Sequence, residues 1–413
     1  LLQETSDLRA AQAAHDDPSD LAKMPVLATS DLDRATKPVP VEVAEVAAGG
    51  HVATLLTHEL PTDGIIYLNV ALDMRRIGLE DLAYAPLLTR MMSELGTDTL
   101  DEVAFTRSKG AKTGGLSVST MTSAKPAAGG IVGAPDDVAA YVMLGGRATS
   151  ARTGELFDLA AAMLTSTDLN NQGRVVEMLK QSVSRLEASV VSSGNAFASS
   201  HLSAQFTLAG GVSERLGGLS QLVTMRAALA EAQSDWPSLL ERLERMRSAL
   251  LTADGAVINL SADDSSLASA SSRVPELLER VGASGAAMTS SPKGWRWSAS
   301  GGGVLLPSYD GLTVGTQVNY VAKAAPIYAP GEVVPGSASV ITKYLRTAYL
   351  WDAVRVQGGA YGCALGFSRF SGVASFSSYR DPNVALTLDN YDGTGAFLRA
   401  NPRHGNMDAH GKV

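Results

Sequence analysis

The feature that most constrains the fold is a run of predicted elements that occurs twice along the chain. The first run is predicted as two paired strands joined by the turn "LPTDG", a helix and two further strands, at residues 51–59, 64–74, 80–96, 114–123 and 137–149. Alternating apolar residues indicate the strands, and Gly96 is a typical helix stop. A strand-and-helix unit of this kind must bury one face of its sheet against its helices.

The second run follows a Ser/Gly-rich stretch at residues 282–311, which we interpret as a connection between units. It is predicted as a strand, a helix, a hairpin and a helix, at residues 312–324, 337–355, 360–381 and 382–400. On the predicted helix 337–355, the residues Ile341, Tyr344, Leu345 and Ala348 would share one face. The repeated order predicts an internal duplication whose second copy is cut short.

A long helical block is predicted between the two runs, at residues 153–251. Its strongest segment places Leu239, Leu243, Met246 and Leu250 on one face, with Asp235 near the cap. A strand at 255–262 and a helix at 271–282 follow. The mixture of strand runs and helix runs predicts an α+β fold with a mixed sheet packed with helices.

The length of 413 residues exceeds one ordinary core, so we expect more than one domain. Residues 1–40 are polar and proline-containing, which favours a linker or arm with one short helix near residues 6–14. A unit over 41–285 and a partial unit over 286–400 follow, and 401–413 is predicted to be a disordered tail.

Composition excludes several classes of protein. A net charge of −8 without a basic stripe argues against nucleic-acid binding. The single Cys363 excludes an internal disulfide framework, and no run of apolar residues is long enough to span a membrane. The start at Leu1 without a targeting segment suggests a fragment or a processed product.

Catalytic motifs are mostly absent from the sequence. The six histidines form neither H-E-x-x-H nor H-x-x-E-H, so we expect no metal site in this chain. His404 and His410 share the tail with Asp408, a loose cluster that could hold a metal adventitiously but is not expected to be a functional site. A K-T-G match at 112–114 and an S-x-x-K match at 290–293 occur in the reverse of the order that penicillin-binding proteins use.

The segment "RVQGGAYG" offers the best candidate site. Arg355 and Tyr361 are hydrogen-bond donors six positions apart, with Gly358 and Gly359 between them. One interpretation is structural, with Arg355 ending a helix and Tyr361 packing in a strand. The other is functional, with the glycines allowing a ligand to approach and both donors pointing at one of its oxygens.

Several longer segments resemble the C-terminal half of presequence proteases, the organellar branch of the pitrilysin-type, inverted-zincin metallopeptidases. These segments include "YLWDAVRVQGGAYG", "SGVASFSSYRDPN", "LDNYDGTGAFLR", "TLLTHELPTDGIIYLNVALDMR", "SKGAKTGGLSVSTMTS" and "TVGTQVNYVAKAAPIY". The resemblance is colinear and extends from about residue 1 to Ala400. It implies a fold of four homologous α/β units, similar to those of mitochondrial processing peptidase, in two halves that close over a chamber.

The resemblance also implies where the metal lies. The family binds zinc through H-x-x-E-H and a distal Glu in the N-terminal half, which this chain does not resemble. The chain would comprise the linker end at 1–40, the third unit at 41–285 and part of the fourth unit at 286–400. In the third unit, Leu87 and Met91 stand at the histidine positions and Arg90 at the glutamate position. Such side chains are poor zinc ligands and bases, so this unit would be non-catalytic.

The resemblance gives Arg355 and Tyr361 a role as residues that reach the substrate backbone near the zinc and stabilise the oxyanion. Gly358 and Gly359 would let the substrate strand approach. The chain would then be the non-zinc part of a metalloendopeptidase that degrades short unfolded peptides, such as cleaved targeting peptides. Its partners would be those peptides and the zinc-bearing N-terminal half, in the mitochondrial matrix or the chloroplast stroma.

A second hypothesis belongs to another class of protein. The missing zinc motif and the shortened fourth unit favour a non-catalytic subunit that holds peptides or supports a complex. The family continues beyond "GAFLRA" with further helices and a closing strand, whereas "NPRHGNMDAHGKV" replaces them here. We therefore expect a C-terminal truncation, with an unfinished sheet in the fourth unit.

Overall fold

The computed structural model describes residues 2–13, 17–285, 295 and 309–401. By contacts the chain divides into Leu1–Val39 with Arg403–Val413, and Pro40–Pro402. The helix expected near the N-terminus is present as α1 (Leu2–Ala13), followed by α2 (Pro18–Leu21) and η1 (Thr29–Asp31). The tail from residue 402 onward, with its histidines, and the S-x-x-K match at 290–293 lie outside the described residues.

A six-stranded mixed sheet forms the core of the larger unit, in the order β1-β2-β6-β3-β5-β4. Its strands are β1 (Glu42–Ala48), β2 (His51–Glu59), β3 (Ile65–Asp73), β4 (Leu116–Ala124), β5 (Val138–Thr149) and β6 (Val257–Ala262). Apart from β1, which the sequence did not predict, these strands match the predicted ones closely. The α+β class is confirmed.

The sequence predicted that the strands at 51–59 and 64–74, which are β2 and β3, pair with each other. This prediction is wrong. Strand β6 lies between them, parallel to β2 and antiparallel to β3. Two strand spacings amount to about 10 Å, which the residues of the turn at 60–64 can span. The connection is held at Gly64, whose N–H donates to the Asp263 carboxylate at 2.8 Å, directly after β6.

Helices cover the large sheet and supply the rest of its core. They are α3 (Ala85–Glu94), α4 (Glu102–Lys112), α5 (Thr153–Thr165), α6 (Gln172–Ser192), α7 (Gly194–Ser203), α8 (Leu208–Gly217), α9 (Leu219–Ser234), α10 (Trp236–Leu250), α11 (Asp264–Ser271) and α12 (Val274–Ala283). The predicted apolar face of α10 is confirmed, since all four of its residues are buried, and Asp235 caps the helix at the Ser238 N–H. No helix among the described residues has both the length and the apolar character needed to cross a bilayer.

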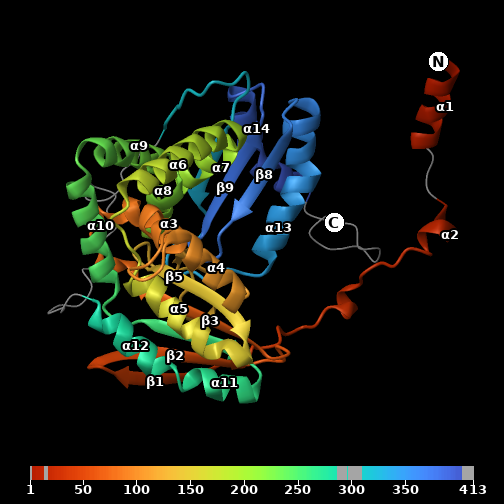
Figure 1. The fold of residues 1–413 in the computed structure, drawn as a ribbon. Coiled ribbons are helices and arrows are strands. Elements are labelled where there is room, and N and C mark those ends of the chain that lie inside the picture. Colours follow the sequence, from red (N-terminus) through yellow and green to blue (C-terminus); the bar gives the residue numbers. More distant parts are fainter. Residues whose placement is uncertain (1, 14–16, 286–294, 296–308, 402–413) are drawn as a thin grey trace. The chain divides into compact units, whose positions relative to one another are not determined.

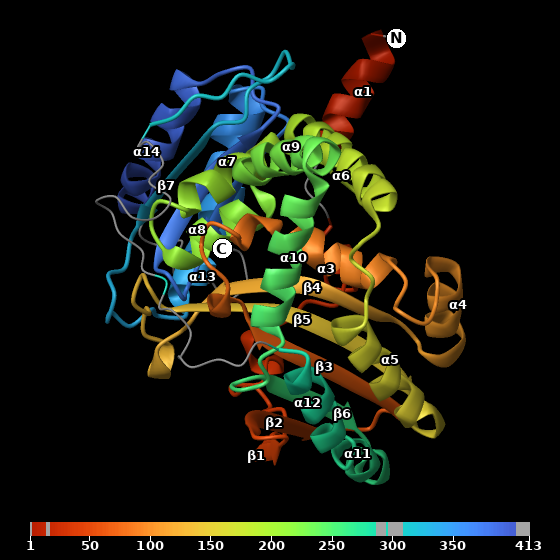
Figure 2. The same ribbon diagram turned by 60° about the vertical axis from the view of Figure 1, so that its left-hand side comes forward.

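A second sheet has three antiparallel strands in the order β7-β9-β8. Its elements are β7 (Ala322–Pro326), α13 (Ser337–Leu345), η6 (Arg346–Gln357), β8 (Gly362–Phe367), β9 (Val373–Tyr379) and α14 (Ala385–Ala400). Helix α7 contacts β7 and β9, whereas α8 contacts β4 and β5. Figures 1 and 2 show α7 and α8 where the two sheets approach each other.

The predicted hairpin is confirmed, whereas two neighbouring predictions need correction. The strand expected at 312–324 is limited to β7, and the last helix begins at Ala385 rather than Pro382. The buried Asp381 accounts for this later start, because its carboxylate accepts hydrogen bonds from the Asn383 N–H and the Thr387 hydroxyl. These bonds hold the chain in a turn ahead of the helix.

The helix predicted over 337–355 is present but changes form. From Arg346 to Gln357 it is wound as a π-helix, a form that is rare and often lies at functional sites. The buried face of this helix also differs from the predicted one. Tyr344 and Leu345 are buried as expected, but Ile341 and Ala348 are exposed. Leu350 and Val354 of η6 fill the core of the small sheet instead.

The two sheets share a topology. The order β3-β5-β4 in the large sheet matches β7-β9-β8 in the small one, with antiparallel pairing throughout. Helices follow at equivalent points: α3 and α13 after the first strand, and α5 and α14 after the third. The duplication predicted from the sequence therefore appears in the strand order. Strands β1, β2 and β6 have no counterparts in the part of the second sheet that the structure describes.

Candidate functional site: an aromatic and arginine ladder

Arg355 lies near the end of the π-helical segment η6, between two aromatic rings. Its guanidinium carbon is 4.1 Å from the ring centroid of Trp351 and 5.6 Å from that of Tyr361. Both distances are typical of cation–π contacts. No described residue gives this guanidinium a hydrogen bond or a carboxylate partner. The rings thus fix the position of the half-buried side chain while its N–H donors stay available.

Tyr361 lies directly before β8, after the two glycines. Its side chain is 64% exposed, so the hydroxyl reaches solvent. Its backbone N–H donates to the carbonyl oxygens of Tyr379 at 3.0 Å and Arg380 at 3.3 Å. The ring meets that of Tyr379 edge-on, with centroids 5.8 Å apart. The backbone and the ring are both anchored, and the polar end is free to meet a ligand.

Gly358 and Gly359 form the turn between Arg355 and Tyr361. A Cβ at Gly358 would lie 2.6 Å from the Val354 carbonyl oxygen, and Gly359 has φ +80°, where side chains are strained. Their N–H groups donate to the carbonyl oxygens of Ala353 and Arg355. The turn thus explains both glycines without a ligand, and their expected contact with a substrate strand stays a prediction.

Three more residues extend the site, and the sequence analysis missed them. The Trp351 ring lies against the Arg355 guanidinium, and the Tyr379 ring meets the Tyr361 ring edge-on. The Arg380 guanidinium carbon lies 5.4 Å from the Tyr379 ring centroid. We call Trp351, Arg355, Tyr361, Tyr379 and Arg380 the ladder. The i, i+4 spacing of Trp351 and Arg355 was the only sequence signal for it. Tyr379 and Arg380 come from another strand, so only the hairpin pairing reveals them.

A buried carboxylate anchors the far end of the ladder. Asp381 is fully buried, and it exchanges two backbone hydrogen bonds with Asn319, at 2.8 and 2.9 Å. The Asn383 N–H and the Thr387 hydroxyl satisfy its carboxylate oxygens at 2.9 and 2.7 Å. A buried carboxylate bonded in this way fixes the backbone beside it. Arg380, the preceding residue, is therefore held in place.

Cys363 lies next to the ladder, in β8, but has the properties of a packing residue. Burial raises the pKa of its thiol, and Arg346 and Arg355 oppose that rise only in part. A thiol with a raised pKa is a weak nucleophile at neutral pH. Cys363 therefore packs against the core of the small sheet and adds no chemistry to the site.

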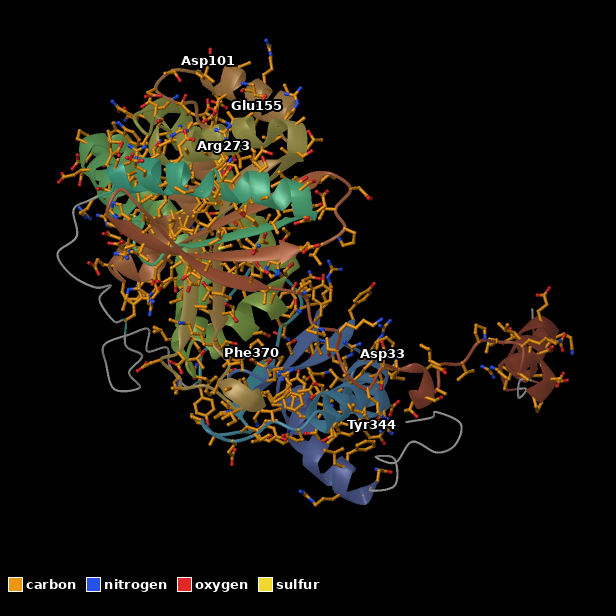
Figure 3. The ribbon with its side chains drawn as sticks, turned by 90° about the horizontal axis from the view of Figure 1, so that it is seen from below. Asp33, Asp101, Glu155, Arg273, Tyr344 and Phe370 are labelled. Carbon is orange, nitrogen blue, oxygen red and sulfur yellow. The ribbon has the colours of Figure 1, made fainter. Side chains whose placement is uncertain are left out.

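A small cavity lies at the opposite end of the hairpin from Tyr361. Its volume is about 230 Å³. Its walls combine hydroxyl-bearing residues with apolar ones and a glycine: Ser203, Thr207, Gly366, Phe367, Ser368, Ser371, Val373 and Ser375. Phe370, in the adjoining β8–β9 turn, and Tyr344, on α13, are both labelled in Figure 3. None of the ladder residues lines this cavity, and no charged side chain does.

The helix that would correspond to the family's zinc helix is α3, and its side chains are committed to packing. Leu87 and Met91 are buried in the core. Arg90 donates to Glu94 on its own helix and to the Met178 carbonyl oxygen and the Ser182 hydroxyl on α6. No group of His, Cys, Asp or Glu side chains among the described residues can hold a metal ion. The residues present here do not fit zinc.

The fold of this chain also occurs in a solved structure. A crystal structure described as a peptidase M16 inactive domain, from Pseudomonas fluorescens, matches with a TM-score of 0.51 at 15% identity, covering 87% of this chain and 80% of that one. At this identity the match shows the fold alone, which this chain shares with that domain.

The family follows from sequence comparison. The family model for the region associated with subfamily C of the M16 peptidases matches residues 1–227, and that of the "PreP C-terminal domain" matches 310–408. The chain belongs to this subfamily of peptidases and corresponds to the C-terminal portion of presequence proteases. It is 35% identical over 401 residues to "Presequence protease 1, chloroplastic/mitochondrial" of Arabidopsis thaliana, covering 97% of this chain. It is 25% identical to "Protein HypA" of Clostridium perfringens, covering 96% of this chain.

The chain spans only part of these relatives. It covers 35% of the length of the Arabidopsis protein and 38% of that of the Clostridium protein. By their names and organisms, these relatives include an organellar protein and a bacterial one.

Proposed function

We propose that this chain supplies the substrate-contacting part of a zinc metalloendopeptidase that degrades short unfolded peptides, such as cleaved organellar targeting peptides. The observation that carries the proposal is the state of Arg355. Two aromatic rings position its guanidinium, no described residue uses its donors, and the exposed Tyr361 hydroxyl lies beside it. Donors that are held in place but unused are suited to an oxygen that arrives with a substrate.

In this proposal, Arg355 and Tyr361 donate to a carbonyl oxygen of the substrate backbone, on which negative charge builds up in the transition state. One well-placed donor of this kind contributes about 2.7–4 kcal/mol. Zinc would be held by the N-terminal half of the intact protein and would supply Lewis-acid chemistry there. Since the donors and the metal lie on different halves, closing the halves would complete the site.

The π-helical winding of η6 gives the proposal a structural basis. It places Leu350 and Val354 in the core while Trp351 and Arg355 stay at the surface, on the same segment. The rings of Trp351 and Tyr361 then hold the guanidinium in one orientation. A preorganised donor loses little free energy to reorientation when the substrate binds.

A second candidate function is a non-catalytic one, in which the chain holds peptides or supports a complex. The observation that favours it is the committed packing of α3, where Leu87 and Met91 belong to the core. A peptide-holding chain would bind peptides at the ladder as the enzyme part would, but only the first function predicts hydrolysis. The names of the relatives favour a mitochondrial or chloroplast location, although a bacterial relative also exists.

The experiment measures hydrolysis of a fluorogenic targeting-type peptide by the chain, alone and mixed with a separately produced zinc-bearing half. We expect activity only in the mixture, and a loss of about 100-fold or more in Arg355→Ala. Arg369→Ala is the matched control, because Arg369 stacks on Phe370 in the hairpin turn, away from the ladder. Equal losses in both variants, or a folded mixture without activity, would refute the enzymatic role.

A further inference from the structure

The backbone of Arg380 adopts a conformation that L-residues disfavour. Its φ is +49°, and Asp63 is the only other non-glycine residue with positive φ in the described ranges. Left-handed conformations bring Cβ close to the following carbonyl oxygen, and Asn or Asp side chains tolerate this better than Arg. Gly would fit here at lower conformational cost. An arginine at such a strained position suggests that its side chain has a functional role.

Neighbouring hydrogen bonds keep Arg380 in this conformation. Its carbonyl oxygen accepts the Tyr361 N–H at 3.3 Å, and the next residue, Asp381, is locked to Asn319 by two backbone hydrogen bonds. Asp381 is fully buried with a satisfied carboxylate, so the turn cannot relax without breaking these bonds. The direction of the Arg380 side chain is therefore fixed by the fold.

That direction places the guanidinium at the end of the ladder opposite Arg355. Arg380 is exposed, and its guanidinium carbon lies 5.4 Å from the Tyr379 ring centroid. Tyr379 is in turn held by Tyr361 and by Tyr320, whose ring centroid is 5.7 Å away. No described residue offers the Arg380 guanidinium a carboxylate or a hydrogen bond.

The ladder thus carries two cations without a described acidic partner. Asp381, the carboxylate next in sequence to Arg380, is buried and satisfied by its own hydrogen bonds. A guanidinium presents a rigid fork of donors that matches both oxygens of a carboxylate. A negatively charged group on a ligand would therefore meet a preformed partner at Arg380.

We propose that Arg380 is a specificity residue that binds a carboxylate of the peptide substrate while Arg355 and Tyr361 contact the backbone. This inference rests on the proposed function of the same site. The carboxylate has two possible sources, the free C-terminus of a short peptide and an acidic side chain within it. Recognition of a C-terminus would favour short peptides over internal segments of long chains.

The test uses fluorescence anisotropy with the full chain and a fluorescein-labelled short peptide of Leu, Ser and Arg. The peptide is made with a free C-terminus, with a C-terminal amide, and as the amide with one internal Glu. We expect the free C-terminus to bind about tenfold more tightly than the amide, as one charged hydrogen-bonded pair provides. In Arg380→Gly this ratio should fall to about one, with the affinity for the amide retained.

Arg369→Gly is the matched control, since it removes the same charge from an arginine that stacks on Phe370 in the hairpin turn. It should keep the tenfold ratio. Because glycine suits positive φ, Arg380→Gly should melt within about 2 °C of the parent chain. If the internal Glu restores tight binding of the amide, the site reads acidic side chains; if not, it reads the C-terminus.

An unchanged ratio in Arg380→Gly would overturn the inference and leave the proposed function standing. If Arg355→Ala left all affinities unchanged, the proposed function would fail, while the ratio would still report on Arg380. Absence of saturable binding by the parent chain to every version of the peptide would overturn both.

Discussion

Replacing Gly359 by Ala tests how the turn positions the ladder. The residue has φ +80°, and an added Cβ would be 3.6 Å from Pro382, an ordinary contact. The cost is therefore conformational rather than steric. A left-handed Ala is about 1–2 kcal/mol unfavourable, and the less flexible unfolded chain returns about 0.4–1 kcal/mol. We expect a net loss of about 1 kcal/mol in the free energy of unfolding.

Urea denaturation followed by far-ultraviolet circular dichroism measures this loss. Gly331→Ala is the control, because Gly331 has φ +89° and nothing within 4 Å of an added Cβ. It should lose the same stability, but only Gly359→Ala should weaken peptide binding, since Gly359 lies between Arg355 and Tyr361. A Gly359→Ala chain as stable as its parent would refute the conformational argument. Equal effects of both variants on binding would refute the link to the ladder.

Two further predictions concern the larger sheet. Arg90→Met should lower the free energy of unfolding by about 2–3 kcal/mol. The reason is that hydrogen bonds from a charged group to the Met178 carbonyl oxygen and its neighbours are lost. An unchanged free energy of unfolding in urea denaturation would contradict this prediction. Hydrogen bonds from Ser266 and the Gly64 N–H lower the pKa of Asp263 below 3.8. The carboxylate therefore stabilises the fold above pH 3.8, and this contribution is lost as the pH falls through the lowered pKa. When the free energy of unfolding is measured against pH, it should fall less steeply on the acid side in Asp263→Asn than in the parent chain. An equally steep fall would contradict the prediction.

Sequence reasoning succeeded where local periodicity encodes the structure. The apolar face of α10, the β8–β9 hairpin and strands β4 and β5 follow from the spacing of residues within one segment. The repeated order of elements also predicted an internal duplication, and the two sheets share a strand order. Strand β6 was correctly predicted as a strand but not as the partner of both β2 and β3. That pairing joins segments about 200 residues apart, and no local pattern specifies it.

The candidate site, too, could be predicted from the sequence only where its residues are neighbours along the chain. By itself the sequence determined that Arg355 and Tyr361 are donors on either side of a glycine turn, because these residues are neighbours along the chain. Only the tertiary structure decided that Tyr379 and Arg380 join them, because antiparallel pairing of β8 and β9 places Tyr379 opposite Gly362. The π-helical winding of the segment that carries Trp351 and Arg355 is likewise a tertiary outcome, since the same residues could have formed an ordinary α-helix.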